Sequence, residues 1–209
     1  MANALKNVLS NPREAKFVYK MQRLSAKSQK RRKEVFESDG IEVPPFLISS
    51  ISTSCNLHCK GCYARSNRIA SDSGEPGRES LSPEQWKKIF TEAAEMGINF
   101  SLLAGGEPMM RKDIIEAVAQ VEEMIFPVFT NGTLITHAYL DFLSAHQNIV
   151  PVISIEGTAL GTDERRGQGA LKSPLFRKIR AAKALGWEHT GGCTLFEHRD
   201  EVQALLASE

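Results

Sequence analysis

Three cysteines, Cys55, Cys59 and Cys62, lie on one short stretch of the chain. They follow residues 46–53, where an apolar run passes into alternating apolar and polar residues, a pattern typical of a buried strand that ends in a loop. A loop of this kind can wrap three sulfurs around one small metal group. A cubane iron-sulfur cluster is normally held by four thiolates, so a loop with three leaves one iron open or takes a fourth ligand from elsewhere.

Composition narrows the class of protein. With 209 residues, of which 42% are hydrophobic, the chain can bury the core of one globular domain. No window approaches the roughly 18 apolar residues of a membrane span, and the first residues lack the apolar region of a secretion signal, so we predict a cytoplasmic protein that binds no membrane. In a reducing compartment, clustered cysteines bind metal more often than they form disulfides. Cys193 stands alone and is most simply a buried small residue.

Residues 1–40 are predicted to form an N-terminal helical extension of a domain that spans residues 41–209. Apolar side chains recur at helical spacing through this extension, and Asn11-Pro12 predicts a break between two helical pieces. The extension carries ten Lys or Arg against four Asp or Glu. Its densest run, Lys30–Lys33, indicates a solvated helix face rather than a nucleic-acid patch, so no nucleic-acid partner is expected.

Beyond a polar loop at residues 71–80, short apolar runs alternate with helical patterns. The clearest helix begins at Ser82, an N-cap followed by a proline and by a glutamine three residues after the cap, and ends at Gly97. The alternation predicts an α/β fold, a parallel sheet with outer helices in right-handed crossovers, and favours a curled, barrel-like arrangement. The predicted strands are 98–104, 126–130, 149–155 and 190–196, and the predicted helices are 111–123, 137–146, 173–186 and 199–206.

The carboxyl ends of the predicted strands carry the residues best suited to chemistry, and ligands of parallel sheets gather at this edge. The first four strands run into Cys55, Gly105–Pro108, Asn131 and Glu156, in that order. The paired glycines allow a ligand to lie against the backbone, and Glu107 adds a carboxylate. A Gly-Gly-Glu-Pro turn alone is more often structural, but the cysteine loop one strand earlier makes a cofactor site the stronger interpretation.

These motifs resemble those of the radical S-adenosylmethionine (radical SAM) superfamily, from residue 44 to at least residue 169. The cluster motif of that family is matched by Cys55, Cys59 and Cys62, and its glycine-rich SAM motif by Gly105, Gly106, Glu107 and Pro108. The resemblance implies a partial (β/α)6 barrel and a 4Fe-4S cluster whose fourth iron is chelated by the amino and carboxylate groups of S-adenosylmethionine (SAM). It also implies backbone contacts from the glycine-rich turn to the SAM amino group.

Within the superfamily, the pattern Cys-Asn-Leu-x-Cys-x-x-Cys-Tyr, with residues 130–132 and 154–157, resembles the branch that modifies peptides or other natural products and often carries a C-terminal SPASM domain. That resemblance implies that Ser154 and Glu156 face the ribose or methionine end of SAM, with Asn131 as a further candidate. It implies an enzyme that reductively cleaves SAM to a 5′-deoxyadenosyl radical, which abstracts hydrogen from an unknown substrate, a peptide being one candidate. A reductant such as flavodoxin or ferredoxin is the implied protein partner.

Two features depart from the family pattern. Gly61 occupies the position before the third cysteine, which is often aromatic and lies near the adenine. From Phe46 onward the sequence offers about five strand-helix units, without a sixth strand or SPASM cysteines. We therefore expect a relative truncated at its C-terminus, with a barrel that is open at one edge and available for a partner to cover.

Two other interpretations remain open. In the first, the protein is a truncated relative that binds a cluster or a peptide but catalyses no reaction. A structural zinc site would combine His58 with Cys55, Cys59 and Cys62, although His58 and Cys59 are adjacent and awkward as two corners of one tetrahedron. A zinc site also gives the turn at residues 105–108 no role, so the cluster interpretation is favoured.

Overall fold

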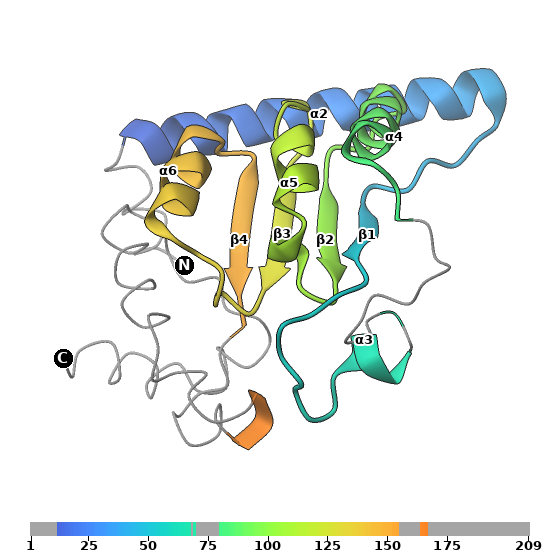
Figure 1. Ribbon diagram of the computed structural model, residues 1–209. Coiled ribbons are helices and arrows are strands. Elements are labelled where there is room, and N and C mark those ends of the chain that lie inside the picture. Colours follow the sequence, from blue (N-terminus) through green and yellow to red (C-terminus); the bar gives the residue numbers. More distant parts are fainter. Residues whose placement is uncertain (1–11, 68, 70–79, 155–163, 167–209) are drawn as a thin grey trace.

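A four-stranded parallel sheet forms the centre of the computed structural model, which describes residues 12–67, 69, 80–154 and 164–166 (Figure 1). The strands are β1 Leu47–Ser52, β2 Ser101–Gly105, β3 Phe126–Thr130 and β4 Ile149–Ile153. They lie in the order β1-β2-β3-β4, and each pairs in parallel with the next. All four carboxyl ends therefore meet at one edge of the sheet, the lower edge in Figure 1.

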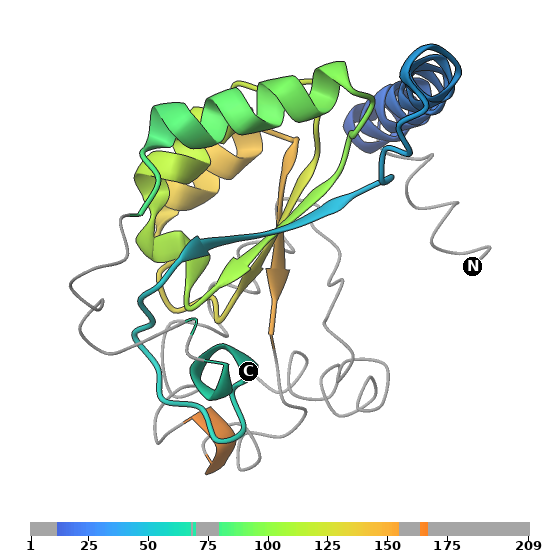
Figure 2. The same ribbon diagram turned by 90° about the vertical axis from the view of Figure 1, so that its right-hand side faces the viewer.

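One face of this sheet is covered by helices, as Figure 2 shows. The covering helices are α4 Pro83–Glu95, α5 Lys112–Val118 and α6 His137–Ala145, each on the connection between two consecutive strands. Two short elements, α3 Tyr63–Ser66 and the 3-10 turn η1 Pro108–Met110, follow the carboxyl ends of β1 and β2. This alternation confirms the predicted α/β fold with a parallel sheet.

The hydrophobic core lies between the sheet and its helices. Phe90 from α4 packs edge to face on Phe126 from β3, with ring centroids 5.0 Å apart. Leu103, Ile114 and Val128 are fully buried around them. Burial of side chains of this size stabilises the fold by about 1.5–3 kcal/mol each, so the core holds the strand ends in a fixed relation to one another.

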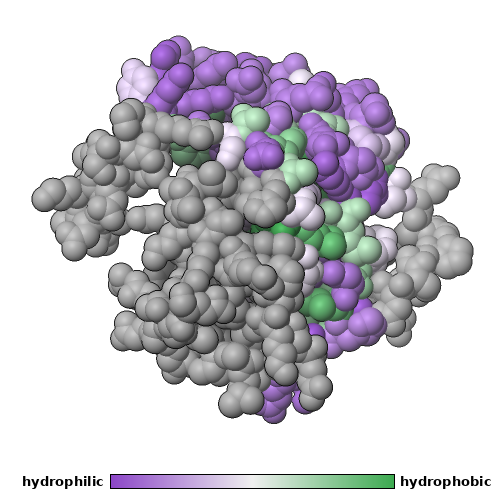
Figure 3. Space-filling view, turned by 60° about the vertical axis from the view of Figure 1, so that its left-hand side comes forward, coloured by the Kyte–Doolittle hydropathy of each residue, from purple (hydrophilic) through white to green (hydrophobic). Residues whose placement is uncertain are grey.

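The long helix α2 Pro12–Asp39 crosses the amino-terminal edge of the sheet, at the top of Figure 1. In the basic run Lys30–Lys33, two arginines serve this docking. Arg31 Nε donates to the carbonyl oxygen of Glu95 at 2.8 Å, and Arg32 Nη1 donates to that of Gly97 at 2.7 Å. Cations are favourable at the carboxyl end of a helix, here the end of α4. Lys30, Arg31 and Lys33 are exposed, in agreement with the predicted solvated face, and Arg32 is the partly buried exception in this run. Hydrophilic residues cover α2 in Figure 3.

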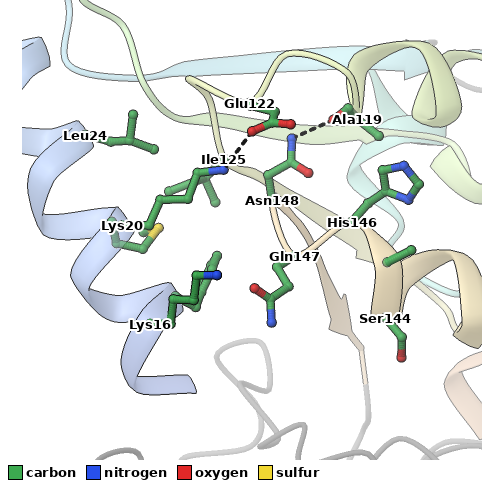
Figure 4. A pocket seen from close by; sticks show the side chains of 13 residues that line it. Lys16, Lys20, Leu24, Ala119, Glu122, Ile125, Ser144, His146, Gln147 and Asn148 are labelled. Atoms are coloured by element: carbon green, nitrogen blue, oxygen red, sulfur yellow. Dashed lines mark hydrogen bonds and ion pairs between the residues drawn. The ribbon is translucent and has the colours of Figure 1, made fainter. Parts of the chain in front are cut away.

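A cavity of about 390 Å³ lies under the first turns of α2, at the edge of the sheet opposite the cysteine loop (Figure 4). Lys20 Nζ and Glu122 Oε2 form an ion pair of 3.2 Å beside it. Asn148 is buried at the start of β4, and its amide donates to the carbonyl oxygen of Ala119 at 3.0 Å. At this end of α2, the Lys20–Glu122 ion pair and apolar residues such as Phe17 and Leu24 border the cavity.

Most predicted elements agree with the structure, with three corrections. The helix predicted over 111–123 ends at Val118, because residues beyond it form turns whose carbonyls accept the amide of Asn148. The strand predicted from residue 98 begins at Ser101, and the strand predicted over 149–155 ends at Ile153. The predictions for residues 1–11, 71–79, 173–186 and 190–206 lie outside the described residues. In the part of the chain that the structure describes, no helix combines the length and apolarity that crossing a bilayer requires.

Candidate functional site

The three predicted cluster cysteines lie on the loop that leaves the carboxyl end of β1 and leads into α3. All three are half-buried, and Cys55 and Cys62 are free thiols. The loop folds back on itself: the Cys62 N–H donates to the carbonyl oxygen of Cys59 at 3.3 Å, and the Leu57 N–H donates to Cys55 Sγ at 3.5 Å. One loop thus presents three thiols beside the edge where the strands end.

The backbone conformation of this loop explains why residue 61 is a glycine. Its φ of +68° lies in the left-handed region, which strains residues with a side chain. No atom lies within 4 Å of where its Cβ would be. The conformation, rather than a lack of space, therefore accounts for glycine at a position where the family often has an aromatic residue.

The thiol of Cys55 lies in a mixed electrostatic environment. Burial raises its pKa above the ordinary range, and the charges of Glu107 and Cys59 raise it further. The hydrogen bond from the Leu57 N–H and the charge of Arg65 act in the opposite direction. Because metals bind the thiolate, loading of this site must release the proton that the buried thiol retains.

The donor set fits a cluster with three cysteine ligands. Among the residues that the structure describes, no three His, Cys, Asp or Glu side chains converge on one point as ligands of a single ion do. The thiolates of a cubane bind separate irons and need not meet at one point. A zinc site would need His58 and the three cysteines to close on one ion at about 2.0–2.3 Å.

The glycine-rich turn after β2 is hydrogen-bonded to the residues that precede Cys55. The N–H of Gly106 donates to the carbonyl oxygen of Ser52, and that of Glu107 to the carbonyl oxygen of Ser54, both at 2.8 Å. Gly105 has a φ of +126°, and a Cβ at this position would lie 2.4 Å from the Ser52 oxygen. Glycine is required here because β1 passes so close, and the turn is fixed one residue from the first cysteine.

Glu107 points into the protein. Its side chain is 1% exposed. Its carboxylate accepts hydrogen bonds from the Met109 N–H at 3.0 Å, the Thr130 hydroxyl at 2.6 Å and the Asn131 N–H at 2.7 Å. Burial raises the pKa of this carboxyl, and the three donors oppose the increase. The contacts of Glu107 are therefore internal ones that join the end of β2 to the end of β3; its predicted contact with SAM stays a prediction.

Asn131 connects β3 to the cysteine loop. It is 7% exposed, and its side-chain amide donates to Asn56 Oδ1 at 2.9 Å. Asn56 Nδ2 in turn donates to Thr133 Oγ1 at 2.8 Å. Asn56, Thr130 and Thr133 are site residues that the sequence did not predict; the available signal was that each is a polar residue close to a strand end.

The remaining predicted SAM residues lie at or beyond the same edge. Pro108 is buried at the start of η1. Ser154 follows β4 and is half-buried, and its N–H donates to the carbonyl oxygen of Thr130 at 2.9 Å. Glu156 and Cys193 lie outside the described residues. The structure thus gathers the cysteine loop, the glycine-rich turn, Asn131 and Ser154 at one edge of the sheet.

The comparisons with known proteins bear on this arrangement. A family model described as the radical SAM superfamily matches residues 49–206. The chain belongs to the radical SAM superfamily. The cofactors of this family are a 4Fe-4S cluster and SAM, and the half-buried thiol loop beside the glycine-rich turn is consistent with both.

Individual relatives show how much of the family the chain covers. The PqqA peptide cyclase of Granulibacter bethesdensis is 31% identical over 147 residues, which cover 69% of this chain and 37% of the relative. The Fe-coproporphyrin III synthase of Methanosarcina barkeri is 32% identical over 134 residues, which cover 63% of this chain and 32% of the relative. The chain thus spans less than half of the length of these curated relatives.

Solved structures show the fold. SuiB of Streptococcus suis, bound to precursor peptide SuiA, superposes with a TM-score of 0.61 at 19% identity, covering 84% of this chain and 39% of SuiB. SuiB has also been solved bound to S-adenosylmethionine, with a TM-score of 0.56 to this chain at 22% identity over 75% of this chain and 35% of SuiB. The predicted partial barrel of the radical SAM type is confirmed at the level of the fold.

Proposed function

We propose that this protein binds a 4Fe-4S cluster through Cys55, Cys59 and Cys62 and binds SAM at the adjoining glycine-rich turn. The observation that carries the proposal is the 2.8 Å hydrogen bond from the Glu107 N–H to the carbonyl oxygen of Ser54. It fixes the two cofactor motifs next to one another, as a cluster that shares its open iron with SAM requires.

The residues of the chain have distinct parts in this proposal. The cysteines hold the cluster, and the backbone from Gly105 to Pro108 lies where the SAM amino group would bind. Asn131, Ser154 and Glu156 are the proposed contacts further along the edge, with the Glu107 carboxylate as a support for the turn. When bound, the reduced cluster would supply one electron that breaks a carbon–sulfur bond of SAM to give methionine and a 5′-deoxyadenosyl radical, and this radical would take a hydrogen atom from the substrate. The protein contributes binding, orientation and the exclusion of water.

A peptide is the proposed class of substrate. In its support, one curated relative is named a peptide cyclase and one structural neighbour holds a precursor peptide. We further propose a cytoplasmic protein reduced by flavodoxin or ferredoxin, because such chemistry needs a low-potential electron donor and an environment without oxygen at the cluster.

Anaerobic reconstitution tests the proposal. Purified protein is treated with iron and sulfide and then with dithionite and SAM, and 5′-deoxyadenosine is measured. We expect brown protein that releases this product. Alanine at Cys55, Cys59 and Cys62 together should abolish iron binding, whereas the matched control Cys193→Ala should retain it.

Other results of the reconstitution experiment would support a different function. A cluster that forms without any 5′-deoxyadenosine indicates a non-catalytic protein that binds a cluster. Protein purified with stoichiometric zinc and unable to take up iron overturns both cluster interpretations. Iron retained by the triple alanine variant contradicts the assignment of the ligands.

A further inference from the structure

The side chains of Asn56, Thr133 and Asn131 form a closed ring of hydrogen bonds. Asn56 Nδ2 donates to Thr133 Oγ1 at 2.8 Å, and the Thr133 hydroxyl donates to Asn131 Oδ1 at 2.6 Å. Asn131 Nδ2 closes the ring by donating to Asn56 Oδ1 at 2.9 Å. Each side chain donates once and accepts once within the ring, and hydrogen bonds in such a chain strengthen one another.

The ring joins the cysteine loop to a rigid part of the molecule. Asn131 is almost fully buried, and its N–H donates to the buried carboxylate of Glu107 at 2.7 Å. The Thr133 N–H also donates to Asn131 Oδ1, at 2.9 Å. Asn56, in contrast, is exposed and follows Cys55 directly. The ring thus connects an exposed residue of the cysteine loop to a buried residue at the end of β3.

We propose that Asn56 is a positioning residue, which holds the cysteine loop against the end of β3 through its side-chain amide. This inference rests on the proposed function, because what it positions is the set of cluster ligands relative to the SAM-binding turn. The ring reaches the loop from β3, while the hydrogen bonds of Gly106 and Glu107 reach it from β2. The loop is therefore held from two neighbouring strands, and the Arg65 guanidinium donates to the Leu57 carbonyl oxygen at 3.0 Å and the Lys60 N–H to that of Arg165 at 2.8 Å. Removal of the ring takes away the side-chain contact of the loop with the end of β3.

Hydrogen exchange in the protein without cofactors tests the tether itself. A net hydrogen bond is worth about 0.5–1.5 kcal/mol, so we expect Asn56→Ala and Thr133→Val to speed exchange across residues 55–62 by about two- to tenfold. Thr133→Ser retains the hydroxyl and should exchange as the wild type does. Asn67→Ala is the matched control: Asn67 caps the carboxyl end of α3, and among the described residues its side-chain amide donates to the carbonyl oxygen of Tyr63 at 3.0 Å.

The double variant Asn56→Ala/Thr133→Val shows whether Thr133 acts on the loop through Asn56. Both bonds of the ring that reach the loop end on Asn56, so the double variant should exchange no faster than Asn56→Ala, whereas a faster double variant would mean that Thr133 holds the loop by another route. If hydrogen exchange across residues 55–62 is unchanged in both single variants, the proposal that the ring tethers the loop is wrong.

Spectroscopy of the reconstituted protein tests the positioning role. In Asn56→Ala we expect iron binding to persist, but the change that SAM produces in the electron paramagnetic resonance spectrum of the reduced cluster to require several times more SAM. If Asn56→Ala exchanges faster but its spectrum responds to SAM as that of the wild type does, then Asn56 tethers the loop without positioning the cluster for SAM. If the wild type itself binds no cluster while the variants still alter exchange, the proposed function is what fails, and the positioning role falls with it.

Discussion

The backbone N–H of Asn131 donates to the carboxylate of Glu107 at 2.7 Å, and the side chain that accepts this hydrogen bond is almost wholly excluded from solvent. Residues 24 positions apart, at the ends of neighbouring strands, are thereby fixed to one another. A carboxylate in a cofactor motif suggests a ligand contact. Here it organises the edge of the sheet on which a ligand would rest.

Removal of the Glu107 carboxylate should destabilise the protein strongly. Glu107→Ala leaves two buried N–H groups and the Thr130 hydroxyl without their acceptor, and we expect the free energy of unfolding to fall by roughly 3–5 kcal/mol. Urea unfolding of the cofactor-free protein measures this. Glu116→Ala removes an exposed carboxylate that pairs with Lys112 one helical turn away and should change stability by less than about 0.5 kcal/mol. Equal effects of the two changes would contradict the structural role.

The same carboxyl predicts a dependence of stability on pH. Burial raises its folded-state pKa above the ordinary value of 4.5, so in the folded protein it keeps its proton to a higher pH than in the unfolded chain. Its contribution to stability is fully present below pH 4.5 and is lost as the pH rises through the folded pKa. Glu107→Gln cannot titrate and supplies the reference.

The quantity to measure is the free energy of unfolding of the wild type minus that of Glu107→Gln across a pH series. We expect this difference to fall as the pH rises from below 4.5 towards neutrality. A difference that grows with pH would mean that the three hydrogen-bond donors and the charge of Arg166 outweigh burial and lower the pKa instead.

Gly105→Ala should damage the junction between the glycine-rich turn and the cysteine loop. The new methyl group would meet the Ser52 carbonyl oxygen at 2.4 Å, and that oxygen belongs to the backbone and cannot rotate away. The φ of +126° adds backbone strain for alanine. We therefore expect the free energy of unfolding to fall by roughly 2–4 kcal/mol. Gly40→Ala separates the two causes, because Gly40 has a φ of +69° but no atom within 4 Å of its Cβ position; it should cost about 1–2 kcal/mol. Thermal unfolding of both variants makes the comparison.

Local features of the fold could be predicted from the sequence because their determinants lie close together in the chain. Ser82 and Gln85 form the predicted capping box: Ser82 Oγ accepts from the Gln85 N–H at 3.2 Å, and the Gln85 side chain accepts from the Ser82 N–H at 2.8 Å. The strand predicted over 126–130 has those limits in the structure. The order of the motifs along the strands was also sufficient to place them at one edge.

The direction of individual side chains could not be predicted, because distant partners determine it. Nothing near Glu107 in the sequence shows that its carboxylate meets residues 23 and 24 positions further on. The partners of Asn56 lie 75 and 77 positions away. The end of α5 likewise depends on Asn148, whose amide binds a carbonyl 29 positions earlier. For this site, the sequence identified the motifs, and the side-chain network between them required the structure.

The basic run on α2 provides a further contrast between residues that look alike in the sequence. Arg32 donates to the Gly97 carbonyl oxygen at 2.7 Å from a partly buried position, whereas the neighbouring Lys33 is exposed and pairs with Glu37 one helical turn away. Arg32→Ala removes a charge-assisted hydrogen bond at the end of α4 and should lower the free energy of unfolding by about 1.5–3 kcal/mol. Lys33→Ala should lower it by less than about 0.5 kcal/mol. Urea unfolding of the two variants measures the difference, and Arg32→Lys should recover part of the loss because it keeps the charge. If Arg32→Ala proves as mild as Lys33→Ala, then the hydrogen bond from Arg32 to Gly97 contributes nothing measurable to the docking of α2.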